Sequence, residues 1–122
     1  MKALTSSYRS NKYLQITRSN SINLEDIKES RRRIVPLFEA TNIERLLSDY
    51  REVNFDSVRA VDIYVQLKDF KEDFPQCKWV ALVHRSAPQN LLQHYKNASS
   101  YYGMELTVHT ELEAAKDWLC YE

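Results

Sequence analysis

The chain has 122 residues, the length of one ordinary domain, and its 17 Lys and Arg balance 17 Asp and Glu, so no overall charge attracts nucleic acid or acidic membranes. Its one glycine, Gly103, excludes the glycine-rich loops of common nucleotide-binding sites and the G-x-S-x-G elbow of many hydrolases, because both need glycine for tight turns. We expect a single domain over residues 1–122.

The N-terminal part of the chain predicts two strands and a helix. Residues 4–9 and 12–18 have the pattern of short strands, which leaves open whether the two pair with each other. Asn23 then offers an N-cap for a helix, and Ile22 and Ile27 have the spacing of a hydrophobic staple across that cap.

The middle of the chain predicts a strand and a second helix. Pro36 removes a backbone donor, so the first helix should kink there, or end early and restart. Residues 43–50 form a strand candidate with Asp49 at its carboxyl end. Asp56 or Ser57 can cap the helix that follows.

Residues 78–84 are the most informative stretch, because five consecutive apolar residues stand there between a lysine and a histidine. A strand without alternation has no wet face, which is typical of the centre of a sheet covered by helices on both sides. Ser86 can cap the next helix, with Pro88 in its first turn and Gly103 at the C′ position.

The last part of the chain predicts a short strand and a helix. Glu105–His109 alternates as a strand, and Thr110 with Glu113 has the spacing of a capping box for the final helix. The element order is β-β-α-β-α-β-α-β-α, which implies right-handed crossovers. The predicted fold class is therefore α/β, with about five strands in a mostly parallel sheet flanked by four helices.

Three stretches in this order resemble a known family. They are residues 46–49 (LLSD), residues 78–83 (KWVALV) and residues 105–119 (ELTVHTELEAAKDWL). Together they are similar to the SpoIIAA-like family, also described as STAS/SEC14-like small bacterial proteins, whose members typically end in a strand, a T-x-x-E-A-type cap and an A-x-x-W-L helix. The resemblance implies a SpoIIAA-like superhelix of successive β-α turns over nearly the whole chain.

The resemblance also implies a role in protein interaction or small-ligand sensing and no catalysis. In the anti-sigma-factor antagonists that this family looks like, a serine after an aspartate is phosphorylated at the start of the helix behind a central strand, which switches partner binding. Asp56 and Ser57 fall at that place, although Val58 and Arg59 stand where the antagonists' motif has small residues and glycine. Ser57 is thus a candidate phosphoswitch, because a helix N-terminus stabilises phosphate. The strong preference for Ser and Asp at N-caps favours the simpler interpretation that Ser57 or Asp56 is a plain N-cap.

A second candidate site lies where the predicted strands end. Polar side chains stand at or just past these ends: Arg18, Asp49, His84, Arg85 and His109. Open α/β sheets bind ligands at this edge, so the five could form an anion site or an acid–base pair. Strand ends are also polar simply because they meet solvent. A pocket uniting Asp49, His84 and His109 would favour an enzyme.

Other common sites are excluded by spacing. The three histidines and two distant cysteines show no H-x-x-x-H, C-x-x-C or H-E-x-x-H pattern, so we expect no metal centre, no cofactor and no catalytic set. Cys77 and Cys120 are expected to be reduced, packed thiols. No apolar run reaches the roughly 18 residues of a membrane span, and no signal-peptide core follows Met1, which favours a cytoplasmic protein.

We therefore expect a non-enzymatic interaction or regulatory module of the SpoIIAA-like kind. Its partner would be another protein or a second copy of itself, and neither nucleic acid nor the membrane interior. The alternative is a carrier or sensor of a small apolar, lipid-like ligand, which an enclosed apolar pocket would support. A third hypothesis is a hydrolase or transferase that uses the strand-end residues.

Overall fold

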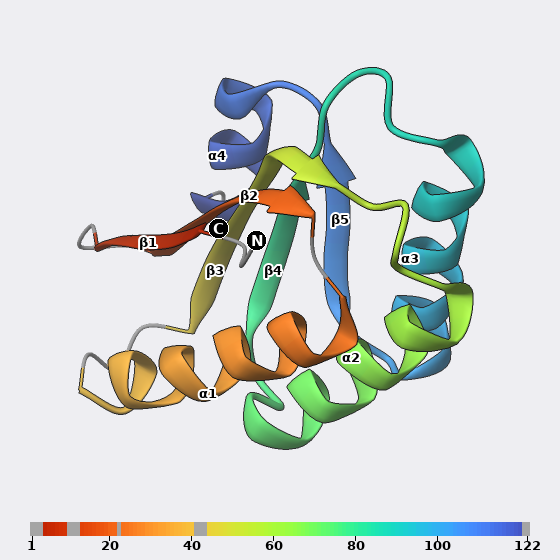
Figure 1. The fold of residues 1–122 in the computed structure, drawn as a ribbon. Coiled ribbons are helices and arrows are strands. Elements are labelled where there is room, and N and C mark those ends of the chain that lie inside the picture. Colours follow the sequence, from red (N-terminus) through yellow and green to blue (C-terminus); the bar gives the residue numbers. More distant parts are fainter. Residues whose placement is uncertain (1–3, 10–12, 22, 41–43, 121–122) are drawn as a thin grey trace.

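The computed structural model describes residues 4–9, 13–21, 23–40 and 44–120. Within them, a five-stranded sheet in the order β1-β2-β3-β4-β5 is flanked by four helices (Figure 1). The elements are, in chain order, β1 (Leu4–Arg9), β2 (Leu14–Ser21), α1 (Leu24–Glu39), β3 (Arg45–Asn54), α2 (Ala60–Asp73), β4 (Lys78–Leu82), α3 (Gln89–Tyr101), β5 (Glu105–His109) and α4 (Leu112–Cys120).

Strands β2 to β5 run parallel, and β1 pairs with β2 in the antiparallel direction. This confirms the predicted α/β class, with a mostly parallel sheet and four helices. The first two strands do pair, with Leu4 opposite Ser19 and Arg9 opposite Leu14.

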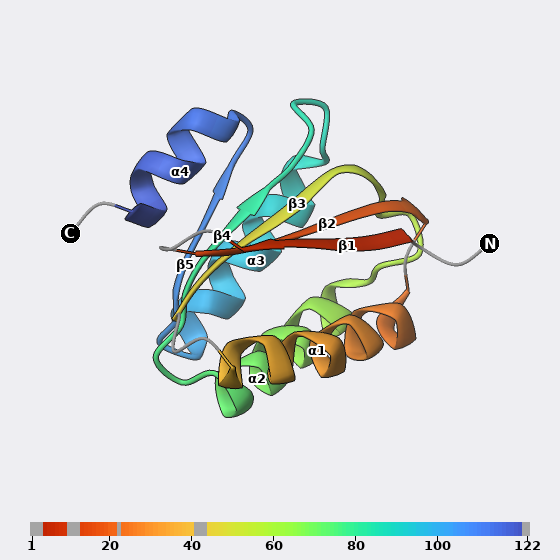
Figure 2. The same cartoon turned by 90° about the vertical axis from the view of Figure 1, so that its left-hand side faces the viewer.

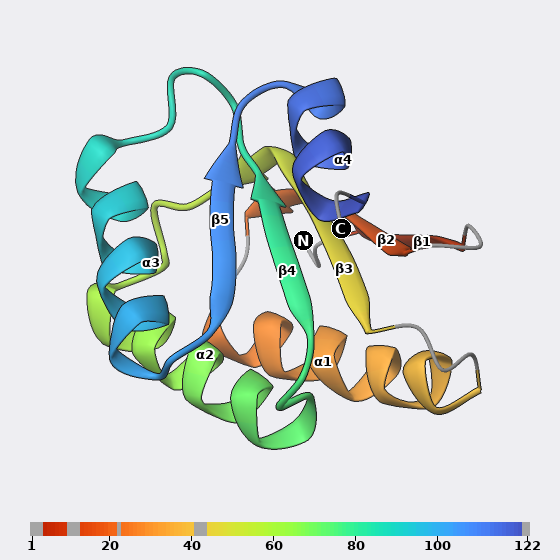
Figure 3. The ribbon, with the colours of Figure 1, turned by 180° about the vertical axis from the view of Figure 1, so that it is seen from behind.

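The helices cover the two faces of the sheet unequally. Helices α1, α2 and α3 lie on one face, and of the described helices only α4 lies on the other (Figures 2 and 3). On the α1–α3 face, Trp79 of β4 stacks on Phe70 of α2 with ring centroids 4.4 Å apart, and Trp79 Nε1 donates to Ser48 Oγ of β3 at 2.9 Å. On the α4 face, Leu119 packs against Val80 and its neighbours.

The apolar stretch around β4 is covered on both sides, as predicted. Residues 79–83 are each only 0 or 1% exposed, because helices pack on both faces of this strand. In the five-strand order, β3 is the middle strand, and β4 lies between β3 and β5. The prediction of an interior strand is therefore confirmed.

Helix α1 begins as its sequence indicates. Asn23 Oδ1 accepts a hydrogen bond from the Asp26 N–H at 3.0 Å, and Asp26 Oδ2 accepts from the Asn23 N–H at 3.0 Å. Pro36 does not end the helix early, since α1 continues to Glu39. Pro36 lies near the end of α1 and is exposed, so the carbonyl that it leaves without a donor can be hydrated. Ile22 of the expected staple lies outside the described residues.

Helices α2 and α3 start later than the sequence predicts. The N-cap of α2 is Arg59, because the Asp62 carboxylate accepts the Arg59 N–H at 2.9 Å and caps the helix from within its first turn. The N-cap of α3 is Pro88, because Ser86 instead binds His84 in the turn before the helix. Neither Asp56, Ser57 nor Ser86 is an N-cap. The predicted C′ glycine is confirmed, since Gly103 follows α3 with φ +65°.

Strand β3 is longer than predicted and contains a bulge. It continues to Asn54 because its last residues pair with Ser19 to Ser21 of β2, so Asp49 lies within the strand and not at its carboxyl end. The register advances by one extra residue on β3, where Tyr50 and Arg51 together lie opposite Arg18.

Helix α4 begins one residue later than a Thr110 cap requires. Its first residue is Leu112, and the Ala115 N–H donates to the Glu111 carbonyl.

Candidate functional site

A cleft of about 590 Å³ opens at the carboxyl edge of the sheet, and we call it the carboxyl-edge cleft. It lies between the turn from β3 to α2, the turn from β4 to α3, and the start of α3, which meet at the same edge in Figure 1. Phe55, Val58 and Leu91 give it apolar walls, and Arg59 and His84 stand on its polar rim. A cleft of this volume is in the range that binds ligands or peptide side chains.

The turn from β3 to α2 is fixed by its own backbone. Asn54 Oδ1 accepts the Asp56 N–H at 2.8 Å, and the Phe55 carbonyl accepts the Val58 N–H at 2.9 Å. The Phe55 ring also meets Tyr50 edge-on, with centroids 5.8 Å apart. These contacts hold Asp56 and Ser57 at the exposed tip of the turn, directly beside residues that line the cleft.

One ion pair joins this turn to α2. Arg59 Nη2 lies 3.0 Å from Asp62 Oδ1, and the hydrogen bond from Arg59 lowers the pKa of the Asp62 carboxyl from its ordinary value near 3.8, against the effect of burial. The Asp62 side chain is 3% exposed whereas the Arg59 side chain is 75% exposed. The carboxylate is thus fixed in place, while the guanidinium keeps most of its surface available to a ligand.

The opposite rim is the turn from β4 to α3. His84 Nδ1 lies 2.7 Å from Ser86 Oγ and accepts the Ser86 backbone N–H at 3.1 Å. An N–H can only donate, so Nδ1 is an acceptor and the proton of the neutral ring resides on Nε2. His84 and Arg59 therefore present donors to the cleft, which fits a ligand that brings acceptors. The described residues contain no cluster that could hold a metal ion.

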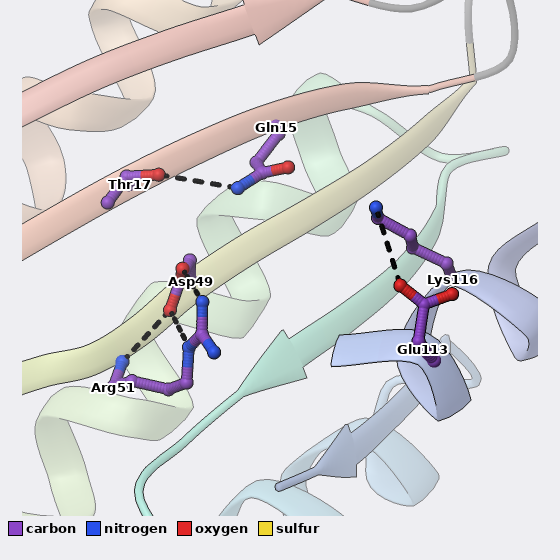
Figure 4. Close-up of polar contacts among 6 residues, drawn as sticks. All are labelled: Gln15, Thr17, Asp49, Arg51, Glu113 and Lys116. Atoms are coloured by element: carbon purple, nitrogen blue, oxygen red, sulfur yellow. Dashed lines mark hydrogen bonds and ion pairs between the residues drawn. The ribbon is translucent and has the colours of Figure 1, made fainter. Parts of the chain in front are cut away.

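Asp49, which sequence analysis placed at a strand end, lies on the α4 face of β3 (Figure 4). Its Oδ1 accepts the Arg51 backbone N–H at 3.1 Å and Nε at 3.0 Å, and its Oδ2 accepts Nη2 at 2.8 Å. The bond to Asp49 raises the pKa of Arg51 above its ordinary value. Asp49 thus binds both the backbone and the side chain of Arg51 at the bulge of β3.

The other predicted strand-end residues lie apart from one another. His109 faces α4, with its ring 6.5 Å from Trp118, and Arg85 pairs with Glu111. Arg18 is buried on the opposite face, beneath α1 and α2. Of the five, only His84 lines the carboxyl-edge cleft. The structure does not bring the five together, nor does it unite Asp49, His84 and His109.

Sequence reasoning missed Arg59 and His94, which line the cleft from the N-cap of α2 and from α3. Arg59 stood out only as a departure from a motif, and His94 had no motif at all. The available signal was the R-x-x-D spacing of Arg59 and Asp62, which places a carboxylate at the third position of a helix, as in a capping box.

No protein-family model and no curated protein matches the chain in sequence. Solved structures match it over nearly its whole length. An uncharacterized DUF3478-family protein with a SpoIIAA-like fold from Shewanella loihica PV-4 is 19% identical with a TM-score of 0.62, over 97% of this chain and 94% of that one. An anti-sigma factor antagonist from Mycobacterium paratuberculosis is 13% identical with a TM-score of 0.63, over 96% and 93%.

The anti-sigma factor antagonist SpoIIAA, in its unphosphorylated form, is 10% identical with a TM-score of 0.57, over 94% of this chain and 95% of that one. Among the described helices, none is long and apolar enough to cross a membrane. Identities this low show the fold and not the activity, and they confirm the predicted resemblance at that level: this chain has the SpoIIAA-like α/β fold.

Proposed function

We propose that this protein is a non-enzymatic regulatory module that binds a protein partner over the carboxyl-edge cleft, and that phosphate on Ser57 weakens this binding. The observation that carries the proposal is the exposed turn of Asp56 and Ser57 beside a cleft with Arg59 and His84 on its rim. Two solved proteins of the same fold are anti-sigma factor antagonists, which supports a partner that is a protein.

The lining of the cleft defines the chemistry of the partner segment. Phe55, Val58 and Leu91 offer apolar contact, which suits one aliphatic or aromatic anchor side chain. Arg59 and His84 offer N–H donors at the rim, which suit a carboxylate or a backbone carbonyl. The cleft therefore fits a segment that combines an apolar anchor with an acidic residue.

Phosphorylation would act through charge. A kinase would transfer the phosphoryl group of ATP to the Ser57 hydroxyl, which adds about −1.5 to −2 charges at neutral pH. Arg59 is two residues away and mostly exposed, so its guanidinium can turn from Asp62 to the phosphate. The partner then loses one donor, and its acidic group meets a like charge.

The experiment starts from a photo-crosslinking residue at position 58, used in the protein's own cell to capture and identify the bound protein. Binding of that purified partner is then titrated by calorimetry against wild type, Ser57→Asp, Ser57→Ala and the control Ser100→Asp, which adds the same charge on exposed α3. We expect Ser57→Asp to bind at least about tenfold more weakly and the other two as wild type. Unaltered binding by Ser57→Asp would refute the switch, and no capture at position 58 would refute the site.

The interior favours this function over carriage of a lipid-like ligand. The cavity between the sheet and helices α1 and α2 measures about 30 Å³, roughly the space of one water molecule and too small for an acyl chain. The carboxyl-edge cleft is larger but has exposed polar residues on its rim, which suits a partner's surface better than an apolar cargo.

A further inference from the structure

Arg18 is a charged side chain inside the core. It lies on β2 opposite the bulge of β3, and the residue is only 3% exposed. Bulges commonly direct a side chain to a particular place, and here Arg18 lines a cavity of about 30 Å³ under α1 and α2. Ser48, Tyr50 and Gln66 supply polar groups to the same cavity.

The guanidinium of Arg18 has one buried N–H group without a hydrogen bond in the part of the chain that the structure describes. Its Nε is buried and has no hydrogen-bond partner among the described residues. Arg31, which lines the same cavity, has its charge met by two carboxylates of α2, since it lies 2.8 Å from Asp69 and 2.8 Å from Asp73. A buried cation pays a desolvation penalty that a bound counter-ion would offset, so the unpaired Nε points to an anion at this place.

The polar neighbours of Arg18 are arranged as donors. Tyr95 donates to Gln66 Oε1 at 2.9 Å, and Gln66 Nε2 donates to Tyr50 Oη at 3.5 Å, so the Tyr50 hydroxyl has its own proton left to give. Ser48 Oγ already accepts from Trp79 Nε1 at 2.9 Å, which likewise leaves its proton to give. The cavity thus has donors from Arg18, Ser48 and Tyr50, and an anion is the ligand that matches three donors.

We propose that this cavity binds one small monovalent anion of the size of chloride, held by Arg18 Nε and the hydroxyls of Ser48 and Tyr50. The volume of about 30 Å³ is that of one water or one halide, whereas phosphate and sulfate are larger. A single negative charge also matches the single charge of Arg18, because that of Arg31 is met by two aspartates. This site lies in the core and is separate from the carboxyl-edge cleft, so it stands independently of the partner proposal.

The first test measures stability against chloride. Wild-type protein is unfolded with urea at constant ionic strength while gluconate, which is too large for the cavity, is exchanged for chloride. An anion that binds only the folded state raises the folding equilibrium constant. Once the chloride concentration exceeds Kd, this constant rises in proportion to it, so a tenfold rise in chloride should raise the folding constant up to about tenfold. No chloride dependence in wild type would overturn the proposal.

Two variants assign the effect to the cavity. Arg18→Met removes the charge and keeps apolar volume, a replacement that buried ionic sites often tolerate, and it should abolish the chloride dependence. Arg33→Met removes an exposed arginine of α1 that pairs only with Glu29 among the described residues, and it should keep the full dependence. Equal chloride dependence in Arg18→Met would overturn the proposal.

A second measurement needs no variant and remains decisive if Arg18→Met does not fold. Crystals of the wild-type protein are grown or soaked in bromide, and the anomalous scattering of bromine is located. We expect a peak within about 3.5 Å of Arg18 Nε, since bromide has the charge of chloride and nearly its size. A peak only elsewhere, or a water without anomalous signal at this place, would overturn the proposal.

Discussion

The two faces of the sheet differ in how their charged side chains are buried and paired. Under α1 to α3 the cover is wide, and Arg18 is 3% exposed, with no hydrogen-bond partner for its Nε among the described residues. On the other face α4 covers β3 to β5, and the Asp49–Arg51 pair lies on β3 with the Arg51 side chain 40% exposed (Figure 4). Three helices on one face can bury a charged side chain, whereas a face with a single helix leaves its charges paired and partly exposed to solvent.

The larger face also carries more of the packing. Trp79, Ile63, Leu67 and Tyr95 are each at most 1% exposed between the sheet and helices α1 to α3. The α4 face has the smaller cluster, in which Leu119 is the buried anchor of the helix. We expect the free energy of unfolding to be concentrated on the α1–α3 face and the α4 face to open more easily.

The largest effect should come from Trp79→Ala. The change removes the stack on Phe70 and the donor to Ser48, so it should cost about 3–5 kcal/mol of unfolding free energy. Urea denaturation measures it, and Leu37→Ala on the surface of α1 should stay within about 0.5 kcal/mol of wild type. A loss below about 1 kcal/mol for Trp79→Ala would contradict the view that this face holds most of the stability.

Leu119→Ala should have a smaller and more local effect. Leu119 is 0% exposed, and its truncation should cost about 2–3 kcal/mol, toward the low end for leucine because a short helix at the sheet margin can settle into the space. Hydrogen exchange should speed up in α4 while α2 keeps its protection. Glu113→Ala is the matched control on the exposed side of α4. Equal loss of protection in α2 would show that the faces unfold as one.

The smallest of the three effects should come from Asp62→Ala, in the first turn of α2 next to the carboxyl-edge cleft. Losing this cap should cost about 1 kcal/mol at pH 7. Because Arg59 lowers the pKa of Asp62 in the folded state, the unfolded chain takes up the proton first, so this contribution is present above about pH 3.8 and is lost as the pH falls through the folded value.

Unfolding curves from pH 7 to acid should therefore show the gap between wild type and Asp62→Ala narrowing below about pH 4. Asp117→Ala, on the exposed side of α4, should show no such gap at any pH. A gap that stays constant into acid would mean that the Asp62 carboxylate is not the source of the stability.

The fold could be predicted where the signal is local. The apolar run of β4, the Asn23 cap and Gly103 each encode an element or its end within a few residues, and each prediction is confirmed. The end of β3 could not be predicted, because residues 51–54 have no apolar run and become a strand only by pairing with β2. Pairing partners distant in sequence leave no mark in a local pattern.

The candidate sites were harder to predict for a related reason. His84 was correctly placed at a strand end, and it lines the cleft. Asp49 and Arg18 were wrongly assigned to the same edge. The pairing of β2 with β3 determines how far β3 extends and where it bulges, and this pairing is not visible in either stretch alone. Ser57 has the composition of an N-cap, yet Asp62 competes for that role from inside the helix and takes it. A charge sealed in the core also leaves no signature, since an arginine near a strand end resembles any solvated residue.

The bulge of β3 bears on how this chain is compared with others of its fold. Where a second chain lacks the extra residue, a gap-free alignment through β3 would set inward-facing residues of one strand against outward-facing residues of the other from Arg51 onward. At identities of 10 to 19%, the sequences share too few residues to reveal this one-residue offset, and the turn after β3 would be misaligned as well. A modification site can thus be transferred to Ser57, or away from it, only after the strands have been superposed in space.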